Sequence, residues 1–180
     1  MLDALQADHN LTVRRVFEDT VLAVLRKSPN PDQVVDKILT RVSNTEGNER
    51  KSLFRILGVV GGDKVRNRLT SVYSKENNVD YQRDAMIAYL SWQDRSGLPD
   101  VEEIIKTTKD KALRAAAERT YVRLAGLPGP SSIEDKVAVW QKSFNLINNP
   151  TDYRRLISSM IEYPSQKTVD LLNSWTGDPK

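Results

Sequence analysis

The sequence contains no cysteine and only one histidine among its 180 residues, and these shortages narrow the chemistry open to the chain. Without cysteine there is no disulfide, no thiol nucleophile and no thiolate ligand for a metal. His9 has no neighbouring serine–aspartate pair or metal-ligand spacing, and a general base needs an orienting partner. Gly61 and Gly62 fit neither glycine pattern that binds phosphate and are interpreted as a turn. We therefore expect a non-enzymatic protein with no catalytic residue, no metal site and no cofactor.

Long apolar runs are missing as well. No segment approaches the ~18–20 apolar residues that span a bilayer, so we expect no membrane insertion. The start, from Met1 to Leu5, lacks the basic and apolar regions of a signal peptide. These features predict a cytoplasmic protein if the chain is complete, and a periplasmic, envelope or secreted one if it is an excised domain. The ending, from Thr176 to Lys180, resembles a turn into another helix and favours the excised domain.

Five apolar helical stretches recur along the chain, each with an arginine near its start. Apolar residues stand three and seven positions after each arginine, in the sets Arg14/Phe17/Val21, Arg50/Leu53/Leu57, Arg83/Met86/Leu90, Arg114/Ala117/Tyr121 and Arg154/Ile157/Ile161. The arginines are 36, 33, 31 and 40 residues apart, and a second, shorter apolar helix follows each. A period of this size is typical of a helical solenoid, in which each helix pair buries its apolar face against its neighbours.

Glycine, proline, asparagine and aspartate mark the breaks between these helices, and no segment alternates with the period of two that a strand requires. The fold class predicted is therefore all-α. We expect a single domain over residues 1–180 that contains five helix pairs, at about 10–43, 47–74, 80–107, 110–147 and 151–176.

The stretch from Thr108 to Ala125 resembles the first helix of a HEAT repeat, with an aspartate at its start and the pattern L-R-x-x-A from Leu113 to Ala117. Residues 57–62 and 88–92 are similar to HEAT segments of large multidomain bacterial envelope or secreted proteins. The resemblance covers nearly the whole chain. It implies a right-handed α-α superhelix of about five HEAT-like pairs, acting as a scaffold for a protein partner or a neighbouring domain. Because one DNA glycosylase family is built from HEAT-like repeats, a nucleic-acid-binding protein or glycosylase is the alternative.

The formal net charge is only +3, from 27 basic and 24 acidic residues. A nucleic-acid binder would carry a larger or more clustered excess. In HEAT arrays the second helices line the concave face, and here their cations gather in the first two pairs, at Lys37, Arg41, Arg66 and Arg68. These four residues are the candidate surface for an acidic partner. Carboxylates dilute the charge in the later pairs, so the sequence disfavours nucleic acid, and it indicates no small-molecule substrate.

The remaining distinctive side chains have structural interpretations. Acidic residues precede several of the recurring arginines, and each arginine is expected to bridge to the helix cap of the neighbouring repeat. We expect Trp140 in the core, and Trp92 and Trp175 at helix ends with their N–H groups reaching water. Ala117 and Tyr121 are expected to be buried between the third and fourth pairs.

Overall fold

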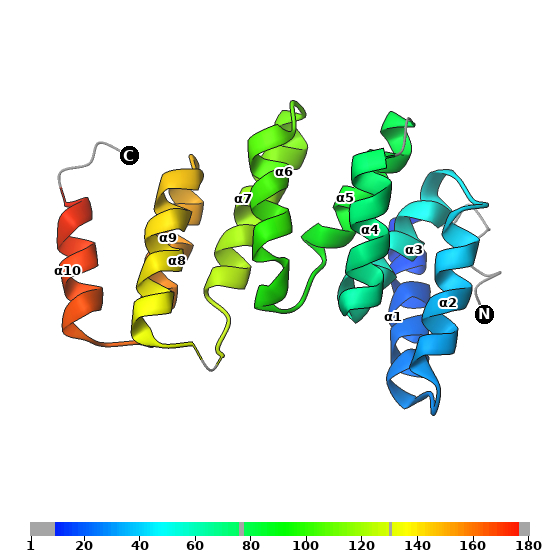
Figure 1. Ribbon diagram of the computed structural model, residues 1–180, viewed down its shortest axis with the longest axis horizontal. Helices are drawn as coiled ribbons and strands as arrows, with labels where there is room; N and C mark the ends of the chain where they lie inside the picture. Colours follow the sequence, from blue (N-terminus) through cyan, green and yellow to red (C-terminus); the bar gives the residue numbers. More distant parts are fainter. Residues whose placement is uncertain (1–9, 76–77, 130, 177–180) are drawn as a thin grey trace. The chain divides into compact units, whose positions relative to one another are not determined.

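The computed structural model describes residues 10–75, 78–129 and 131–176. Within these ranges the chain contains ten α-helices, one short 3-10 helix and no strand (Figure 1). The all-α prediction is therefore confirmed for this part of the chain. The helices are α1 (Leu11–Lys27), α2 (Pro31–Val42), α3 (Gly47–Val60), α4 (Asp63–Lys75), α5 (Val79–Leu90), η2 (Arg95–Gly97), α6 (Leu98–Thr107), α7 (Lys111–Ala125), α8 (Ile133–Leu146), α9 (Pro150–Met160) and α10 (Gln166–Trp175).

The predicted helix boundaries lie within a few residues of the observed ones, because capping and turn residues mark them in the sequence. The Asn10 side chain caps α1 by accepting a hydrogen bond from the Val13 N–H at 3.0 Å. Pro31 occupies the first turn of α2, where its missing N–H leaves no helical bond unmade. Gly61 ends α3 with a φ of 66°, which lies in the left-handed region that favours glycine.

The chain divides into two compact units, Met1–Gln93 and Asp94–Lys180. The first unit contains α1 to α5, and the second contains η2 and α6 to α10. The third predicted pair, 80–107, is thus shared between the units, with α5 in the first and α6 in the second. The organisation of residues 1–180 as a single domain stays a prediction.

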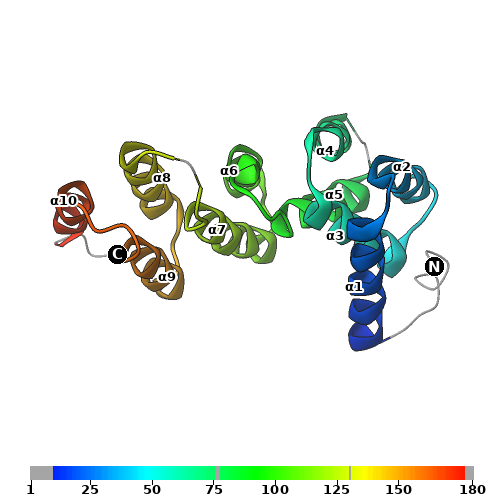
Figure 2. The same ribbon diagram turned by 90° about the horizontal axis from the view of Figure 1, so that it is seen from below.

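In the first unit, each helix packs against the next helix but one along the chain. Helix α3 packs against both α1 and α5, and α2 packs against α4. Figure 2 shows α2 and α4 on one side of this unit and α1, α3 and α5 on the other. The unit therefore has two layers, one of first helices and one of second helices.

In the second unit, α7 packs against α6, α8 and α9, and α8 packs against α10. Asp110 caps α7 by accepting hydrogen bonds from the backbone of Ala112 and Leu113. Ser132 and Asp135 form a reciprocal capping box at the start of α8. None of the helices described in either unit has both the length and the apolar character needed to cross a membrane.

The core contains the aromatic and small side chains of the predicted stripes. Ala117 and Tyr121 on α7 are 0% and 2% exposed, as predicted, and Trp140 is fully buried. Trp92 and Trp175 are buried too, which corrects the expectation that their N–H groups reach water: Trp175 Nε1 donates to Gln141 Oε1 at 3.3 Å. An internal amide thus replaces water as the indole's partner.

Two of the five predicted stripes have the wrong register. On α9, Ile157 and Ile161 are 41% and 75% exposed, whereas Leu156 and Met160 are buried. On α5, the predicted Met86 and Leu90 are half-buried, and the fully buried apolar side chains are instead Ala85 and Ala88. Both helices carry apolar residues on two faces. The positions three and seven residues after the arginine fell on the more exposed of these faces.

Candidate functional site

The predicted cationic residues lie on α2 and α4, which pack against each other in the first unit. Lys37 and Arg68 are exposed, whereas Arg41 and Arg66 are half-buried. Arg41 Nε donates a hydrogen bond to Glu49 Oε1 at 2.6 Å, so a carboxylate on α3 neutralises this cation. The nearby Lys64 and Asp36 form a further ion pair between α4 and α2.

Arg66 and Arg68 point to different sides of α4, because two residues on a helix are separated by about 200°. Arg68 Nη2 donates to Ser43 Oγ, at the end of α2, at 2.9 Å. The Arg66 backbone carbonyl oxygen accepts from the Tyr89 hydroxyl of α5 at 3.4 Å. The structure therefore brings Arg68 to the end of α2, the helix that carries Lys37 and Arg41.

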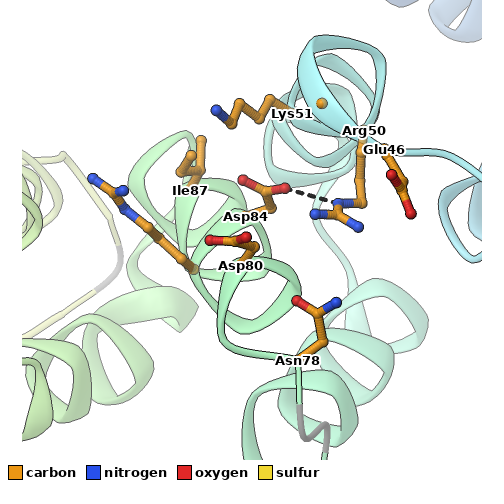
Figure 3. A pocket seen from close by; sticks show the side chains of 9 residues that line it. Glu46, Arg50, Lys51, Asn78, Asp80, Asp84 and Ile87 are labelled. Carbon is orange, nitrogen blue, oxygen red and sulfur yellow. Dashed lines mark hydrogen bonds and ion pairs between the residues drawn. The ribbon is translucent and has the colours of Figure 1, made fainter.

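A pocket of about 430 Å³ opens between the N-terminal halves of α3 and α5 (Figure 3). A second pocket of similar volume shares Glu46, Arg50 and Asn78 with it. The lining of the first pocket combines three cationic side chains with three carboxylates, so its charge is balanced. Its lining residues are Glu46, Gly47, Arg50, Lys51, Asn78, Asp80, Arg83, Asp84 and Ile87.

Arg50 lines both pockets and is held by several groups at once. Its Nε donates to Asp84 Oδ2 at 2.7 Å, and both side chains are buried. The guanidinium carbon lies 5.0 Å from the centroid of the Tyr81 ring, a cation–π arrangement. Arg50 Nη1 also donates to the Thr45 carbonyl at 3.5 Å. Arg50 thus connects α3 to α5 and forms a bridge between first helices, but its partner Asp84 lies in the interior of α5 and not at its cap, Asn78, where the bridge was predicted.

The sequence patterns missed a set of buried polar side chains, one on each odd-numbered helix. They stand 34, 32, 34 and 34 residues apart, a more regular spacing than that of the arginines. That spacing is visible in the sequence and is the signal that could have found them. The set, called here the buried polar ladder, is Glu18, Ser52, Asp84, Glu118 and Asp152.

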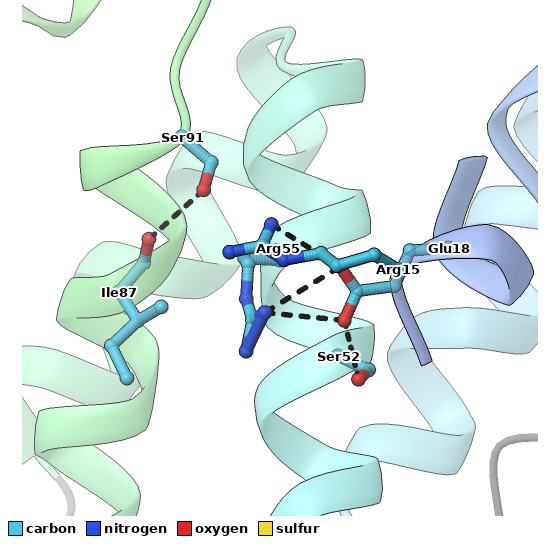
Figure 4. A network of polar contacts seen from close by, with 6 residues as sticks. All are labelled: Arg15, Glu18, Ser52, Arg55, Ile87 and Ser91. Atoms are coloured by element: carbon cyan, nitrogen blue, oxygen red, sulfur yellow. Dashed lines mark hydrogen bonds and ion pairs between the residues drawn. The ribbon is translucent and has the colours of Figure 1, made fainter. Parts of the chain in front are cut away.

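The first step of the ladder joins α1 to α3 (Figure 4). Ser52 Oγ donates to Glu18 Oε1 at 2.6 Å, and Arg55 Nη1 lies 3.3 Å from the same oxygen. Burial lowers the pKa of the Arg55 guanidinium, Glu18 opposes this shift, and Arg15 and Arg14 add to it. The buried Glu18 carboxylate is thus compensated by a hydroxyl and a guanidinium from the next first helix.

The second unit has comparable networks. Glu118 on α7 accepts hydrogen bonds from the Asn148 backbone N–H at 3.3 Å and from its side-chain amide at 3.2 Å, which ties α7 to the loop before α9. Glu102 on α6 receives Lys106 Nζ at 2.6 Å and Lys142 Nζ, from α8, at 2.7 Å. Burial alone would raise the pKa of Glu102, but the hydrogen bonds from Lys106 and Lys142 outweigh it and hold the pKa below its ordinary value.

These networks pair carboxylates with cations, hydroxyls and amides, and such contacts hold neighbouring helices together. No three or more His, Cys, Asp or Glu side chains are grouped to hold a metal ion in the ranges that the structure covers. His9 lies outside the described residues. Comparisons of the chain with protein-family models, with curated proteins and with solved structures found no match.

Proposed function

We propose that the chain is a HEAT-like helical-repeat scaffold, a right-handed α-α superhelix that binds a protein partner or a neighbouring domain and catalyses no reaction. We further propose that it forms part of a larger bacterial protein. The observation that carries the proposal is the buried polar ladder. Its members recur on every odd-numbered helix at intervals of 32 to 34 residues, which is the pattern of a repeated helix pair.

Side-chain contacts at a nearly constant sequence separation also support the proposal. Glu18 bonds Ser52, Arg50 bonds Asp84, and Gln141 bonds Trp175, in each case across 34 residues. A solenoid makes contacts of this kind because each repeat touches mainly its neighbours. A bundle with mixed connectivity would make contacts at many different separations.

The surface offered to a partner is the layer of second helices in the first unit. Lys37 and Arg68 are exposed there, whereas Arg41 and Lys64 are paired with carboxylates. This arrangement suits a partner that brings a few separate carboxylates. It suits a nucleic-acid backbone poorly, because that ligand needs a continuous series of cations.

A DNA-binding experiment separates the scaffold from the glycosylase alternative. The protein is titrated into a labelled duplex that contains an alkylated base, at several salt concentrations, beside a Lys37→Glu variant. We expect weak binding that disappears at moderate salt, and no release of the base. Salt-resistant binding that Lys37→Glu reduces, together with base excision that Asp36→Asn abolishes, would replace the scaffold with the glycosylase.

A further inference from the structure

The first helix carries an apolar stripe on the side that faces away from α3. Val13, Val16, Thr20 and Val24 follow one another at intervals of three and four residues, so they share one face of α1. The three valines are exposed, Val16 at 61%. Val16 stands two residues before Glu18, which faces α3, and so points about 200° away from it. This set of four residues is called here the α1 face.

Helix α9 carries the corresponding stripe at the other end of the chain. Arg154, Ile157 and Ile161 have the same helical spacing, and the two isoleucines are exposed, Ile161 at 75%. Ser159 faces α7, since a Cβ at Gly126 would lie 2.9 Å from the Ser159 Cβ. Ile161 stands two residues later and therefore points away from α7. Arg154, Ile157 and Ile161 form the α9 face.

We propose that the α9 face of one copy docks on the α1 face of a second copy, so that the chain self-associates head to tail. The inference rests on the proposed repeat architecture. In the first unit α1 packs on α3 and α3 packs on α5, and in the second α7 packs on α9. Helix α3 makes its two contacts from opposite sides, because Ser52 meets Glu18 of α1 and Arg50, about 200° away around the helix, meets Asp84 of α5. Docking of α9 on a second α1 continues that series.

The two faces also match in chemistry. Each consists mainly of β-branched aliphatic side chains that are well exposed, and burying them together removes apolar surface from water on both partners. Each face contains only three or four side chains, so the area buried between them lies at the low end of specific interfaces, below about 1,200 Å². We therefore expect weak, concentration-dependent association. Because the two faces differ, the contact is heterologous and adds copies in a row instead of closing a dimer.

The test is sedimentation velocity of the full chain over roughly a hundredfold range of concentration, enough to populate a weak complex. Val16→Glu blocks the α1 face, and the double variant Ile157→Glu/Ile161→Glu blocks the α9 face. Val79→Glu is the matched control, because Val79 is exposed but lies on neither face. Circular dichroism confirms that each variant is folded, which is expected because all the substituted side chains are exposed.

We expect the wild type and Val79→Glu to form species that grow with concentration. Each blocked variant should weaken association at least about tenfold, since a charge would be buried in the contact. An equimolar mixture of the two blocked variants should form a one-to-one dimer and nothing larger, because it retains one intact junction. A wild type that stays monomeric, a mixture that stays monomeric, or a contact blocked by only one of the variants would overturn the proposal. Failure here, with intramolecular distances in dilute protein still those of a repeat array, would leave the proposed scaffold intact.

Discussion

A substitution at Gly58 gives the sharpest single test of how the first helices of the pairs pack together. It lies in the interior of α3, where it faces α5. A Cβ added to it would stand 1.9 Å from the Ala88 carbonyl oxygen, 2.7 Å from the Ala88 carbonyl carbon and 2.9 Å from its Cα. All three are backbone atoms, so no side-chain rotation relieves the contact. Gly58→Ala therefore forces α3 and α5 apart.

Two opposing terms set the size of the effect. Replacing glycine by alanine inside a helix stabilises it by about 1 kcal/mol. Overpacking a core contact costs about 1–3 kcal/mol, and more where backbone must move. Separation of the helices would also strain the buried Arg50–Asp84 pair, which is 2.7 Å long and joins the same two helices. Because the clash is with backbone, the cost lies at the upper end of that range, and we expect the free energy of unfolding to fall by about 2 kcal/mol overall.

The assay is urea denaturation followed by tryptophan fluorescence, with the midpoint and slope compared between variants. Trp92 is buried in the first unit, stacked on Tyr89 at 5.7 Å between ring centroids, and contributes the part of the signal that reports the unfolding of that unit, while Trp140 and Trp175 report the second unit. Asn67→Ala, at an exposed interior position of α4, is the control and should change stability by less than about 0.5 kcal/mol. A Gly58→Ala protein as stable as the wild type, or more stable, would refute the close approach of α3 and α5.

Three further predictions concern the two units separately. Ala117→Arg should destabilise the protein by several kcal/mol, because it buries an unpaired charge in a filled contact; an unchanged melting temperature would show that this face of α7 is not buried. Asp84→Ala should cost about 3–5 kcal/mol by leaving the buried Arg50 unpaired, whereas Asp80→Ala, one turn earlier and exposed, should cost under about 1 kcal/mol; equal losses would exclude a structural ion pair. The pKa of Tyr121 is raised from 10.0 to about 12, first by burial and then by Glu102. Stability should therefore fall as the pH rises from about 10 to about 12, because only the unfolded state releases this proton readily, and Tyr121→Phe should remove that part of the dependence in an alkaline denaturation series.

The helices themselves could be predicted from the sequence, because local residues determine their limits. Asn10, Pro31, Asp110 and Ser132 act within one turn of the helices that they begin. Gly61 likewise caps the C-terminal end of α3. Capping depends on a few neighbouring backbone groups, so it can be inferred without knowledge of the tertiary structure.

Helix register was harder to predict where two faces of a helix are apolar. On α9 the arginine pattern selected Ile157 and Ile161, but α7 packs on the side that carries Asp152 and Leu156. The buried face includes a carboxylate, which hydropathy alone assigns to solvent. A charged residue becomes compatible with burial only when a partner compensates it, and the partner of Glu18, for example, lies 34 residues away.

The candidate cationic surface shows the same limit. The predicted helix ranges placed Lys37, Arg41, Arg66 and Arg68 on the second helices of their pairs, and the four residues lie there. The pairing of Arg41 with Glu49 depends on how α2 meets α3, and that contact is set by core packing. Their role in binding a partner stays a prediction.

The repeat array is tested most directly by distances between spin labels on first helices. The chain has no cysteine, so labels can be attached to cysteines introduced at Thr12, Asp80 and Thr151. Each is exposed and is the second residue of its helix, on α1, α5 and α9. Adjacent packed helices are about 8–10 Å apart, so a five-pair array places α5 about 16–20 Å from α1 and α9 about 32–40 Å from it. Double electron–electron resonance at low protein concentration should give a distance between labels at Thr12 and Thr151 that is about twice the distance between labels at Thr12 and Asp80. A distance to Thr151 no longer than that to Asp80 would contradict the array.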